Sequence, residues 1–339
     1  RIIFHFFKNF ILTKSLNIEE IRPAVLMEIR DKLYQEDLKI LNNSDKIKVN
    51  CPACNSNNHI DFLTIYNSTL VKCSNCLTIF IHDRPTENAL ENFHTNSKSG
   101  EFWEKIYQKT EIVRKEKIFK PRIKMVNEIL KEYGVADCNT MLEVGCGYGW
   151  FLELAKESKL ANHFIAVEPS PKFCEACKRI PGIEVVQKTI EKYKSNINAD
   201  LIVNFELISQ LFDPSSFLKS CYERLTSNGM LIFSTTNGLA LDIEMLREKH
   251  DLISPHILNL FNPESITVLL KSVGFRNIKI MTPGLYDISN IIEKSKSNSI
   301  ADKFFSIILN KNNPELIDDM QLLVQKYLLS SHMVVSAQK

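Results

Sequence analysis

Three glycines at alternate positions follow a short apolar run in MLEVGCGYGWFLELA, residues 141–155. The run Met141–Val144 has the composition of a buried strand, and apolar residues resume at helical spacing after the glycines. Gly145, Gly147 and Gly149 therefore predict a tight turn between a strand and a helix, where a backbone without side chains can approach a ligand closely.

The spacing of these glycines narrows the class of ligand. A dinucleotide-binding turn reads GxGxxG, and its third glycine would fall where this chain has Trp150. Nineteen residues past Gly149, a second apolar strand ends in Glu168, whose carboxylate can accept hydrogen bonds from both hydroxyls of a ribose. The pattern favours a nucleoside without a pyrophosphate. The alternative is a turn that only closes a strand–helix unit.

Four cysteines in two CxxC pairs form a second group with chemical potential. Cys51 and Cys54 are separated by 18 residues from Cys73 and Cys76, and the segment between the pairs reads as a β-hairpin. Four thiolates can form a closed tetrahedral shell around Zn²⁺, so the spacing predicts a structural zinc ribbon. Such a shell leaves no coordination position for catalysis.

Length, charge and cysteine content limit the remaining possibilities. The 339 residues exceed one ordinary domain, and the net charge of +2 gives no broad basic field for nucleic acid or a membrane, which favours a small substrate. Nine cysteines without a secretory cleavage signal predict a reducing, cytoplasmic location. The aromatic start of the chain, RIIFHFFKNFIL, is too short to span a membrane and predicts a packing helix.

The order of the predicted elements indicates the fold class. Strands and helices alternate after residue 135, which is typical of a doubly wound, seven-stranded, parallel Rossmann-like α/β sheet, and the final strand is expected at its edge. The predicted organisation is an N-terminal helical segment at 1–48, a zinc ribbon at 49–84, a helical connector at 85–134, and the sheet domain at 135–339 with a helical insertion at about 284–330.

The motifs LEVGCGYG, AVEPS and LFNPESITVLLKSVGF resemble those of class I S-adenosylmethionine-dependent methyltransferases, over about residues 120–283 and the final strand. The resemblance implies S-adenosylmethionine as the cofactor. Thr189 stands where many members carry an aspartate, and Ser209 and Gln210 stand where many read glutamate-histidine. The cofactor residues that it implies are Glu143, Gly145, Gly147 and Gly149 at the methionine part, Glu168 at the ribose, Thr189 and Ile190 at the adenine, and Phe205.

Methyl transfer to a hydroxyl or an activated carbon requires a base, and His256 is the sequence candidate. It lies in an irregular stretch after the fifth strand; the alternative is a histidine that fills a loop. Trp103 and Tyr107 could form a stacking wall for a substrate, and Arg114 and Arg122 could bind a phosphate or the cofactor carboxylate. An aromatic core stripe and a solvated charged face are the alternatives for these four residues.

The combination of ribbon, connector and sheet resembles bacterial methyltransferases of surface-polysaccharide and antibiotic-sugar pathways. That resemblance implies a nucleotide-linked sugar or related precursor as the substrate. The near-neutral charge, the aromatic connector, the two arginines suited to phosphate and the helical insertion together favour a phosphorylated small molecule over a polymer. An RNA-modifying methyltransferase and a non-catalytic binding protein are the alternatives. Lys72 is the only lysine or arginine between Cys51 and Cys76, which disfavours RNA binding by the ribbon. The intact glycine pattern and Glu168 disfavour a non-catalytic role.

Overall fold

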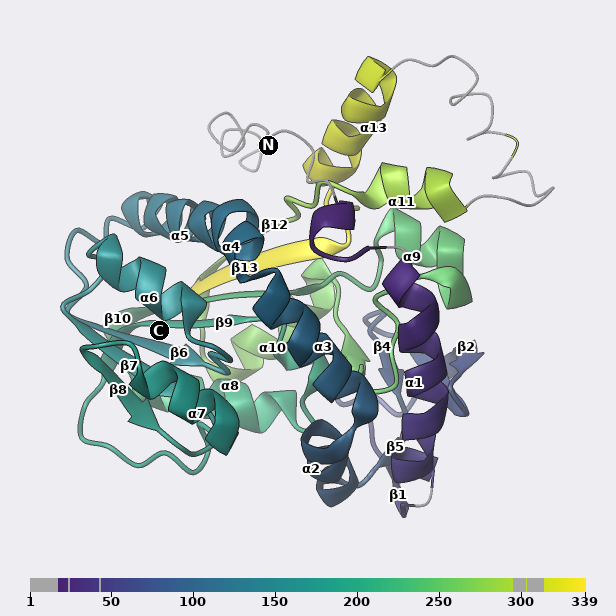
Figure 1. The fold of residues 1–339 in the computed structure, drawn as a ribbon, viewed down its shortest axis with the longest axis horizontal. Helices are drawn as coiled ribbons and strands as arrows, with labels where there is room; N and C mark the ends of the chain where they lie inside the picture. Colours follow the sequence, from purple (N-terminus) through teal and green to yellow (C-terminus); the bar gives the residue numbers. More distant parts are fainter. Residues whose placement is uncertain (1–17, 24, 43, 295–302, 304–313) are drawn as a thin grey trace.

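The computed structural model describes residues 18–23, 25–42, 44–294, 303 and 314–339. A seven-stranded sheet lies at the centre of the molecule and carries helices on both faces (Figure 1). The predicted N-terminal packing helix falls outside the described residues. In spatial order the strands are β12 (Arg276–Met281), β13 (His332–Gln338), β10 (Leu225–Thr236), β9 (Ala199–Phe205), β6 (Thr140–Val144), β7 (His163–Val167) and β8 (Ile183–Val186).

This order confirms the predicted seven-stranded, doubly wound sheet, but the prediction for the final strand was wrong. β13 lies between β10 and β12 and runs antiparallel to both, so the sheet is mixed and β12 forms the edge. Met333, Val334 and Val335 are at most 1% exposed, because both neighbouring strands and the helices enclose them. A nearly continuous apolar run is typical of a strand that is buried on both faces.

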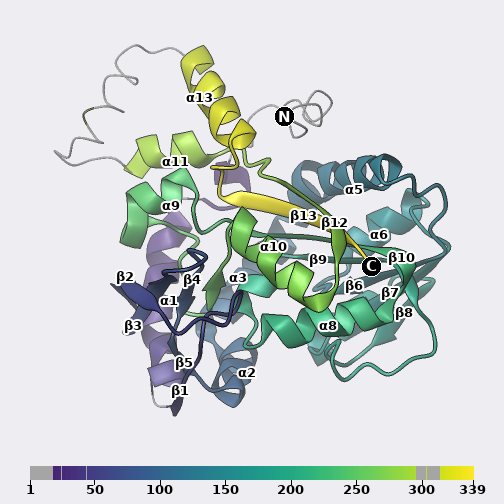
Figure 2. The same ribbon diagram turned by 180° about the vertical axis from the view of Figure 1, so that it is seen from behind.

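Two layers of helices cover the sheet (Figures 1 and 2). Apolar side chains of α5 (Lys120–Glu132), α6 (Trp150–Glu157) and α7 (Pro171–Lys178) pack in one core cluster, and those of α8 (Pro214–Arg224) and α10 (Pro263–Val273) pack in another. The start of α10 is fixed locally. Its N-cap Asn262 accepts a hydrogen bond from the Ser265 backbone N–H at 2.9 Å, and Pro263 occupies the first turn.

The cysteine-containing segment forms a separate small sheet. The predicted hairpin is present as β2 (His59–Ile65) and β3 (Ser68–Cys73), and β4 (Ile79–Ile81) pairs with β3. β11 (Asn259–Leu260), which follows β10 in the chain, adds a fourth strand to this sheet. The ribbon is therefore tied to the central sheet domain by backbone hydrogen bonds.

Arg84 strengthens this junction from the inside. It lies in β5 (Asp83–Pro85), which pairs with β1 (Lys46–Lys48), and only 1% of it is exposed. Its guanidinium donates to the carbonyls of Ile81 and Phe212 at 3.0 and 2.9 Å and to Asn259 Oδ1 at 3.2 Å. Burial lowers the pKa of Arg84 to about 10, so the side chain remains charged at neutral pH.

We expect Arg84→Met to lower the free energy of unfolding by about 3 kcal/mol, because buried oxygen acceptors from the ribbon and the sheet domain lose their donor. Urea denaturation followed by circular dichroism measures the change. Arg276→Met is the matched control: Arg276 is exposed at the edge of the central sheet, and we expect a change within about 0.5 kcal/mol. Equal effects of the two substitutions would contradict the role of Arg84.

Helices from both ends of the chain surround the carboxyl ends of β9 and β10 (Figure 1). The side chain of Asp37 in α1 accepts from the backbone N–H groups of Lys98 and Ser99, both at 2.8 Å, which fixes the first turn of α3. None of the described helices combines the length and apolar character needed to cross a bilayer. The helices around the sheet are η2 (Ile18–Glu20), α1 (Val25–Asn42), α2 (Glu87–Asn96), α3 (Lys98–Lys109), α4 (Glu111–Arg114), the π-helical turn η3 (Lys115–Phe119), η4 (Ile208–Gln210), α9 (Leu241–Leu246), η5 (Arg247–Lys249), α11 (Asp287–Lys294) and α13 (Pro314–Lys326).

Helices α5, α11 and α13 lie within the segments that the sequence assigns to the connector and to the insertion. α5 falls within the predicted connector at 85–134, yet its apolar face packs on the central sheet. α11 and α13 lie within the predicted insertion at 284–330 and stand beyond the start of β13 (Figure 1). The boundaries themselves stay a prediction.

Candidate active site

The glycine turn (Gly145, Gly147 and Gly149) connects β6 to α6. The φ angles of the three glycines are 71°, 53° and 74°. These values lie in the left-handed region, which residues other than glycine rarely adopt. A Cβ atom placed on Gly147 would meet nothing within 4 Å, whereas one on Gly145 would lie 3.1 Å from Leu207 Cδ2. The turn is therefore closed on the side of the β9 loop and open above Gly147, where a ligand can contact the backbone.

Glu168 lies beside this turn at the carboxyl end of β7. Its carboxylate accepts hydrogen bonds from the backbone N–H groups of Gly147 at 3.3 Å and Ser170 at 2.9 Å. Burial raises the pKa of Glu168, and these two hydrogen bonds offset part of that effect. Parallel pairing of β6 with β7 places the carboxylate and the turn at the same end of the sheet.

Glu143, in β6 before the turn, carries an unsatisfied acceptor. It is 3% exposed, and within the described part of the chain its Oε2 has no hydrogen-bond partner. Burial raises the pKa of Glu143 well above its ordinary value, while the Arg122 guanidinium acts in the opposite direction. A buried carboxyl oxygen without a donor is costly, so this position fits a ligand that brings a cationic or N–H group.

Three further residues in the implied cofactor set lie at the same end of the sheet. Thr189 and Ile190 lie shortly after β8, which pairs in parallel with the strand β7 that precedes Glu168, and Ile190 is buried. Phe205 ends β9; its ring contacts Phe151 with centroids 4.7 Å apart, and the Arg122 guanidinium lies 4.7 Å from its centroid. The structure thus brings the implied cofactor residues together along β6, β7, β8 and β9.

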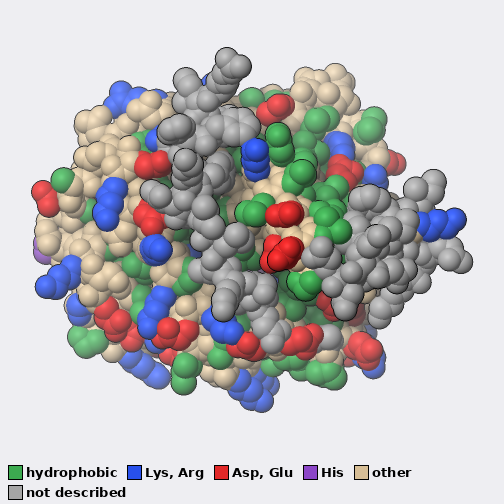
Figure 3. Space-filling model, turned by 90° about the horizontal axis from the view of Figure 1, so that it is seen from above, with side chains coloured by type: hydrophobic (Ala, Val, Ile, Leu, Met, Phe, Trp, Pro, Cys, Tyr) green, Lys and Arg blue, Asp and Glu red, His purple; other side chains and the backbone are tan. Residues whose placement is uncertain are grey.

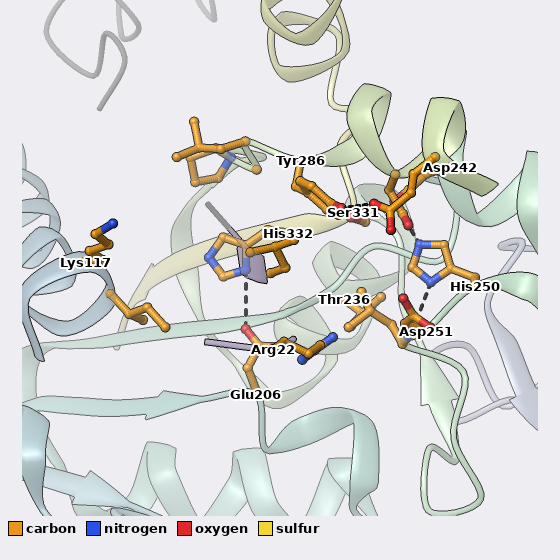
Figure 4. Close-up of a pocket in the computed structure, with 18 of the residues that line it drawn as sticks. Arg22, Lys117, Glu206, Thr236, Asp242, His250, Asp251, Tyr286, Ser331 and His332 are labelled. Carbon is orange, nitrogen blue, oxygen red and sulfur yellow. Dashed lines mark hydrogen bonds and ion pairs between the residues drawn. The ribbon is translucent and has the colours of Figure 1, made fainter. Parts of the chain in front are cut away.

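A cavity of about 1000 Å³ adjoins this region at the carboxyl ends of β9 and β10 and the start of β13 (Figure 4). Residues 205–207 connect the two parts: Glu206 lines the cavity, and Leu207 packs against the glycine turn. Many charged and polar residues line the cavity, and they include Arg22, Arg122, Glu206, Asp242, His250, Ser331 and His332.

His250 is held by partners on both ring nitrogens. Its Nε2 lies 2.8 Å from Asp242 Oδ2, and its Nδ1 accepts from the Leu252 backbone N–H at 3.1 Å. Both side chains of the His250–Asp242 pair are almost completely buried. Because neither nitrogen is free, His250 stabilises the loop after α9 and cannot accept a substrate proton without losing one of these bonds.

His256 lies outside the lining of the cavity. Its ring is surrounded by Tyr34, Phe93 and His94, with centroid distances of 6.4, 5.8 and 6.0 Å. Burial, with a smaller effect of His94, lowers the pKa of His256 to about 3, so the ring is neutral at physiological pH. A backbone hydrogen bond from the Leu258 N–H to the Ser209 carbonyl connects the segment that contains His256 to the turn after β9. The catalytic role of His256 stays a prediction.

The four predicted substrate residues separate into two groups. The rings of Trp103 and Tyr107 in α3 lie with centroids 5.9 Å apart and are tilted by 31°, and the Arg114 guanidinium lies 4.1 Å from the Tyr107 ring centroid. Arg114 also donates to the Ile21 carbonyl at 2.9 Å, so it anchors the N-terminal turn. Only Arg122 of the four lines the cavity.

Sequence reasoning missed Glu206, Arg22 and His332. Glu206 directly follows a predicted parallel strand, and ligands bind at the carboxyl ends of the strands in such sheets. Its position in the sequence could therefore have predicted a site residue. Arg22 and His332 enter the cavity from the two ends of the chain. No local pattern brings those two segments together.

The cysteine cluster (Cys51, Cys54, Cys73 and Cys76) is compact: its four Sγ atoms all lie within 4.8 Å of one another. The closest pairs are Cys51 with Cys76 at 3.4 Å and Cys54 with Cys73 at 3.5 Å. Tetrahedral Zn–S bonds of about 2.3 Å give S–S separations of about 3.8 Å, so modest adjustment accommodates the ion. It is the one metal-type grouping found among the residues that the structure describes.

A family model for the methyltransferase domain matches residues 106–280, just over half of the 339 residues. The chain belongs to this family of methyltransferase domains. The matched range contains the glycine turn, Glu168, Arg122 and Glu206, and it excludes the cysteine cluster and His332.

Curated relatives match less than half of the chain. A probable S-adenosylmethionine-dependent methyltransferase of Mycobacterium tuberculosis is 28% identical over 140 residues, covering 41% of this chain and 49% of the relative. A ubiquinone biosynthesis O-methyltransferase of Bradyrhizobium diazoefficiens is 29% identical over 102 residues, covering 29% of this chain and 40% of the relative. The chain thus spans at most about half the length of these curated relatives.

Solved methyltransferases are similar at lower identity. A S-adenosylmethionine-dependent methyltransferase from Archaeoglobus fulgidus has 20% identity and a TM-score of 0.44, covering 67% of this chain and 98% of its own. The plantazolicin methyltransferase BpumL, solved with S-adenosylhomocysteine (SAH), has 15% identity and a TM-score of 0.47, covering 74% of this chain and 93% of its own.

Proposed function

We propose that this protein transfers a methyl group from S-adenosylmethionine to a small molecule. One observation carries the proposal: the Glu168 carboxylate lies beside a glycine turn that is open above Gly147, at the carboxyl ends of adjacent parallel strands. A carboxylate can accept hydrogen bonds from both ribose hydroxyls, and a nucleoside requires a backbone that it can approach closely. The two requirements are met side by side.

The remaining residues of the region suit the other parts of this cofactor. Thr189 and Ile190 would flank the adenine, while Glu143 would offer its unpartnered oxygen to the amino group of the methionine part. Arg122, which lies over Phe205, would be available for the methionine carboxylate. When bound, the cofactor supplies a methyl group that its sulfonium charge has already activated. The protein contributes mainly positioning and a proton acceptor.

For the acceptor we propose a phosphorylated small molecule, with a nucleotide-linked sugar as the first choice. Arg22 lines the cavity, and its guanidinium matches the oxygens of a phosphate. On the face that carries α5 and α13, Lys and Arg side chains alternate with Asp and Glu instead of forming one basic field (Figure 3). That distribution is the opposite of an RNA-binding surface. We place this activity in the cytoplasm.

We also propose that the cysteine cluster holds one structural Zn²⁺. Backbone N–H groups of Ala53 and Cys54 point to Cys51 Sγ, and that of Thr78 points to Cys76 Sγ. N–H donors of this kind stabilise thiolates, which is the form that binds zinc. The four thiolates leave no open position, so the ion would hold the ribbon together and take no part in methyl transfer.

Two experiments test the proposed function. Calorimetry with SAH is expected to give one site per chain, and heat with NAD but none with SAH would refute the cofactor. A screen with methyl-labelled S-adenosylmethionine against nucleotide-sugars, free metabolites and bulk RNA, read by mass spectrometry, then identifies the acceptor. We expect label in a nucleotide-sugar. Label in RNA alone would refute the small-molecule proposal.

A further inference from the structure

We propose that His332 is the base that removes the acceptor proton, and that Glu206 positions it. This inference rests on the proposed methyl transfer. In Figure 4, His332 at the start of β13 and Glu206 after β9 face each other across the end of β10, and His332 Nδ1 lies 3.3 Å from Glu206 Oε1. Both side chains remain partly accessible because they line the cavity. A base must reach its substrate, and this pair can.

The contact with Glu206 decides which nitrogen of His332 is the base. An ionised carboxylate can only accept, so the proton of the neutral imidazole lies on Nδ1, facing Oε1. Nε2 then carries the lone pair, and no partner for it is found within the described residues. This arrangement differs from that of His250, whose two nitrogens are both occupied.

Glu206 is held in place more firmly than an ordinary loop residue. Its φ of 57° lies in the left-handed region, which a glutamate rarely adopts, and such strain clusters at functional sites. The backbone is fixed by hydrogen bonds to the Ser234 carbonyl at 2.9 Å and from Gln210 Nε2 at 3.0 Å. Glu206 Oε1 accepts a hydrogen bond from Ser234 Oγ at 2.6 Å, and Arg122 Nη2 lies 4.0 Å from the same oxygen.

These contacts keep Glu206 ionised. Burial alone would raise its pKa, but His332, Arg122 and Ser234 outweigh that effect and lower the pKa of Glu206 to about 2. Arg22, Lys117 and other charged side chains line the same cavity, and Asp287 of α11 has its oxygens occupied by Ser330, Ser331 and Gln321. Among the described residues, the carboxylate found in contact with the imidazole is that of Glu206.

The position of the pair matches the place where the methyl group would arrive. Glu206 is flanked by Phe205 and Leu207, and Leu207 packs against the glycine turn at Gly145. In the step itself, His332 Nε2 takes the proton from an O–H or N–H of the acceptor. The electron pair left on the acceptor atom forms the bond to the methyl carbon, and the carbon–sulfur pair returns to sulfur. Glu206 stabilises the imidazolium that results.

A nuclear magnetic resonance experiment tests the pair without any acceptor. Long-range ¹H–¹⁵N spectra of protein with labelled imidazoles, saturated with SAH at a pH where His332 is neutral, are expected to show its proton on Nδ1. The His332→Gln variant assigns the signal, and Glu206→Gln is expected to disturb this tautomer. A proton on Nε2 in the wild-type protein would overturn the proposal. Failure of SAH to bind would instead count against the proposed function.

Kinetics with the acceptor found in the screen give the second test. We expect His332→Gln to lower kcat by about 10² to 10⁴ while SAH affinity stays the same, and imidazole in the buffer to restore part of the turnover of His332→Gly. Glu206→Gln should lower kcat more than it changes KM, because the imidazole loses the carboxylate that orients it, and Glu206→Asp should recover part of the loss.

The exposed His163, at the other end of the sheet, supplies the control variant His163→Gln, which should be unchanged. His256→Ala is the competing variant, because the sequence alone favours His256 as the base. Full kcat in His332→Gln together with a large loss in His256→Ala would assign the base to His256 and refute the role of His332. Loss of kcat in His332→Gln without imidazole rescue in His332→Gly, together with an unchanged kcat in Glu206→Gln, would also refute it.

Discussion

Replacing Glu168 by alanine is expected to weaken SAH binding at least 100-fold. In the proposed site this carboxylate accepts both ribose hydroxyls, and hydrogen bonds to a charged acceptor contribute about 1.5 to 3 kcal/mol each. A loss of about 3 kcal/mol corresponds to a factor of roughly 100 in Kd. Calorimetric titration of the variant with SAH measures the effect directly, and no methyl acceptor is needed.

Two further variants separate the binding effect from a folding effect. Glu168→Gln keeps one oxygen acceptor for the N–H groups of Gly147 and Ser170, so we expect the turn to hold while affinity still falls. Glu184→Ala removes an exposed carboxylate from the adjacent strand β8 and should leave Kd unchanged. If a correctly folded Glu168→Ala variant bound SAH with wild-type affinity, the proposal that Glu168 binds the ribose would be refuted.

Removing one thiolate from the cysteine cluster is expected to produce the largest loss of stability. Cys73 is completely buried, and Cys73→Ser should release the zinc and lower the free energy of unfolding by at least about 3 kcal/mol. The reason is that Cys51, Val71 and Phe80 share one apolar cluster with residues of the central sheet, so a loosened ribbon also exposes that sheet. Elemental analysis together with urea denaturation measures both quantities.

The control for this experiment is a cysteine outside the cluster. Cys138 is half-buried before β6, and its Sγ lies 3.7 Å from the Thr140 carbonyl, so Cys138→Ser should retain about one zinc per chain. Freshly purified wild-type protein that contains no zinc, with four titratable ribbon thiols, would refute the structural ion. The stability of Cys73→Ser would then report only the packing of a buried sulfur.

The proposed site combines residues from the middle of the chain with residues from its first and last described segments. The middle of the chain supplies the glycine turn, Glu168 and Glu206, all of which lie in the part that matches the methyltransferase domain. Arg22, from the N-terminal turn, and His332, from the last strand, both line the cavity. The acceptor would therefore be bound largely by segments outside or at the margin of the matched domain.

The sequence by itself determined the seven-stranded sheet, the hairpin between the cysteine pairs, and the neighbouring positions of Glu168 and the glycine turn. Each of these follows from local rules: strand periodicity, the φ angles that only glycine adopts readily, and the meeting of parallel strand ends at one edge of a sheet. The cysteine cluster is equally local, because one hairpin brings both pairs together.

Only the tertiary structure decided the surroundings of the two candidate bases. The antiparallel insertion of β13 between β10 and β12 places His332 opposite Glu206, 126 residues away in the chain. His256 instead packs against Tyr34, Phe93 and His94, which come from helices that precede the sheet domain. Strand order and helix docking are set by the burial of apolar surface over the whole molecule, so the local pattern around a histidine does not specify which side chains it meets.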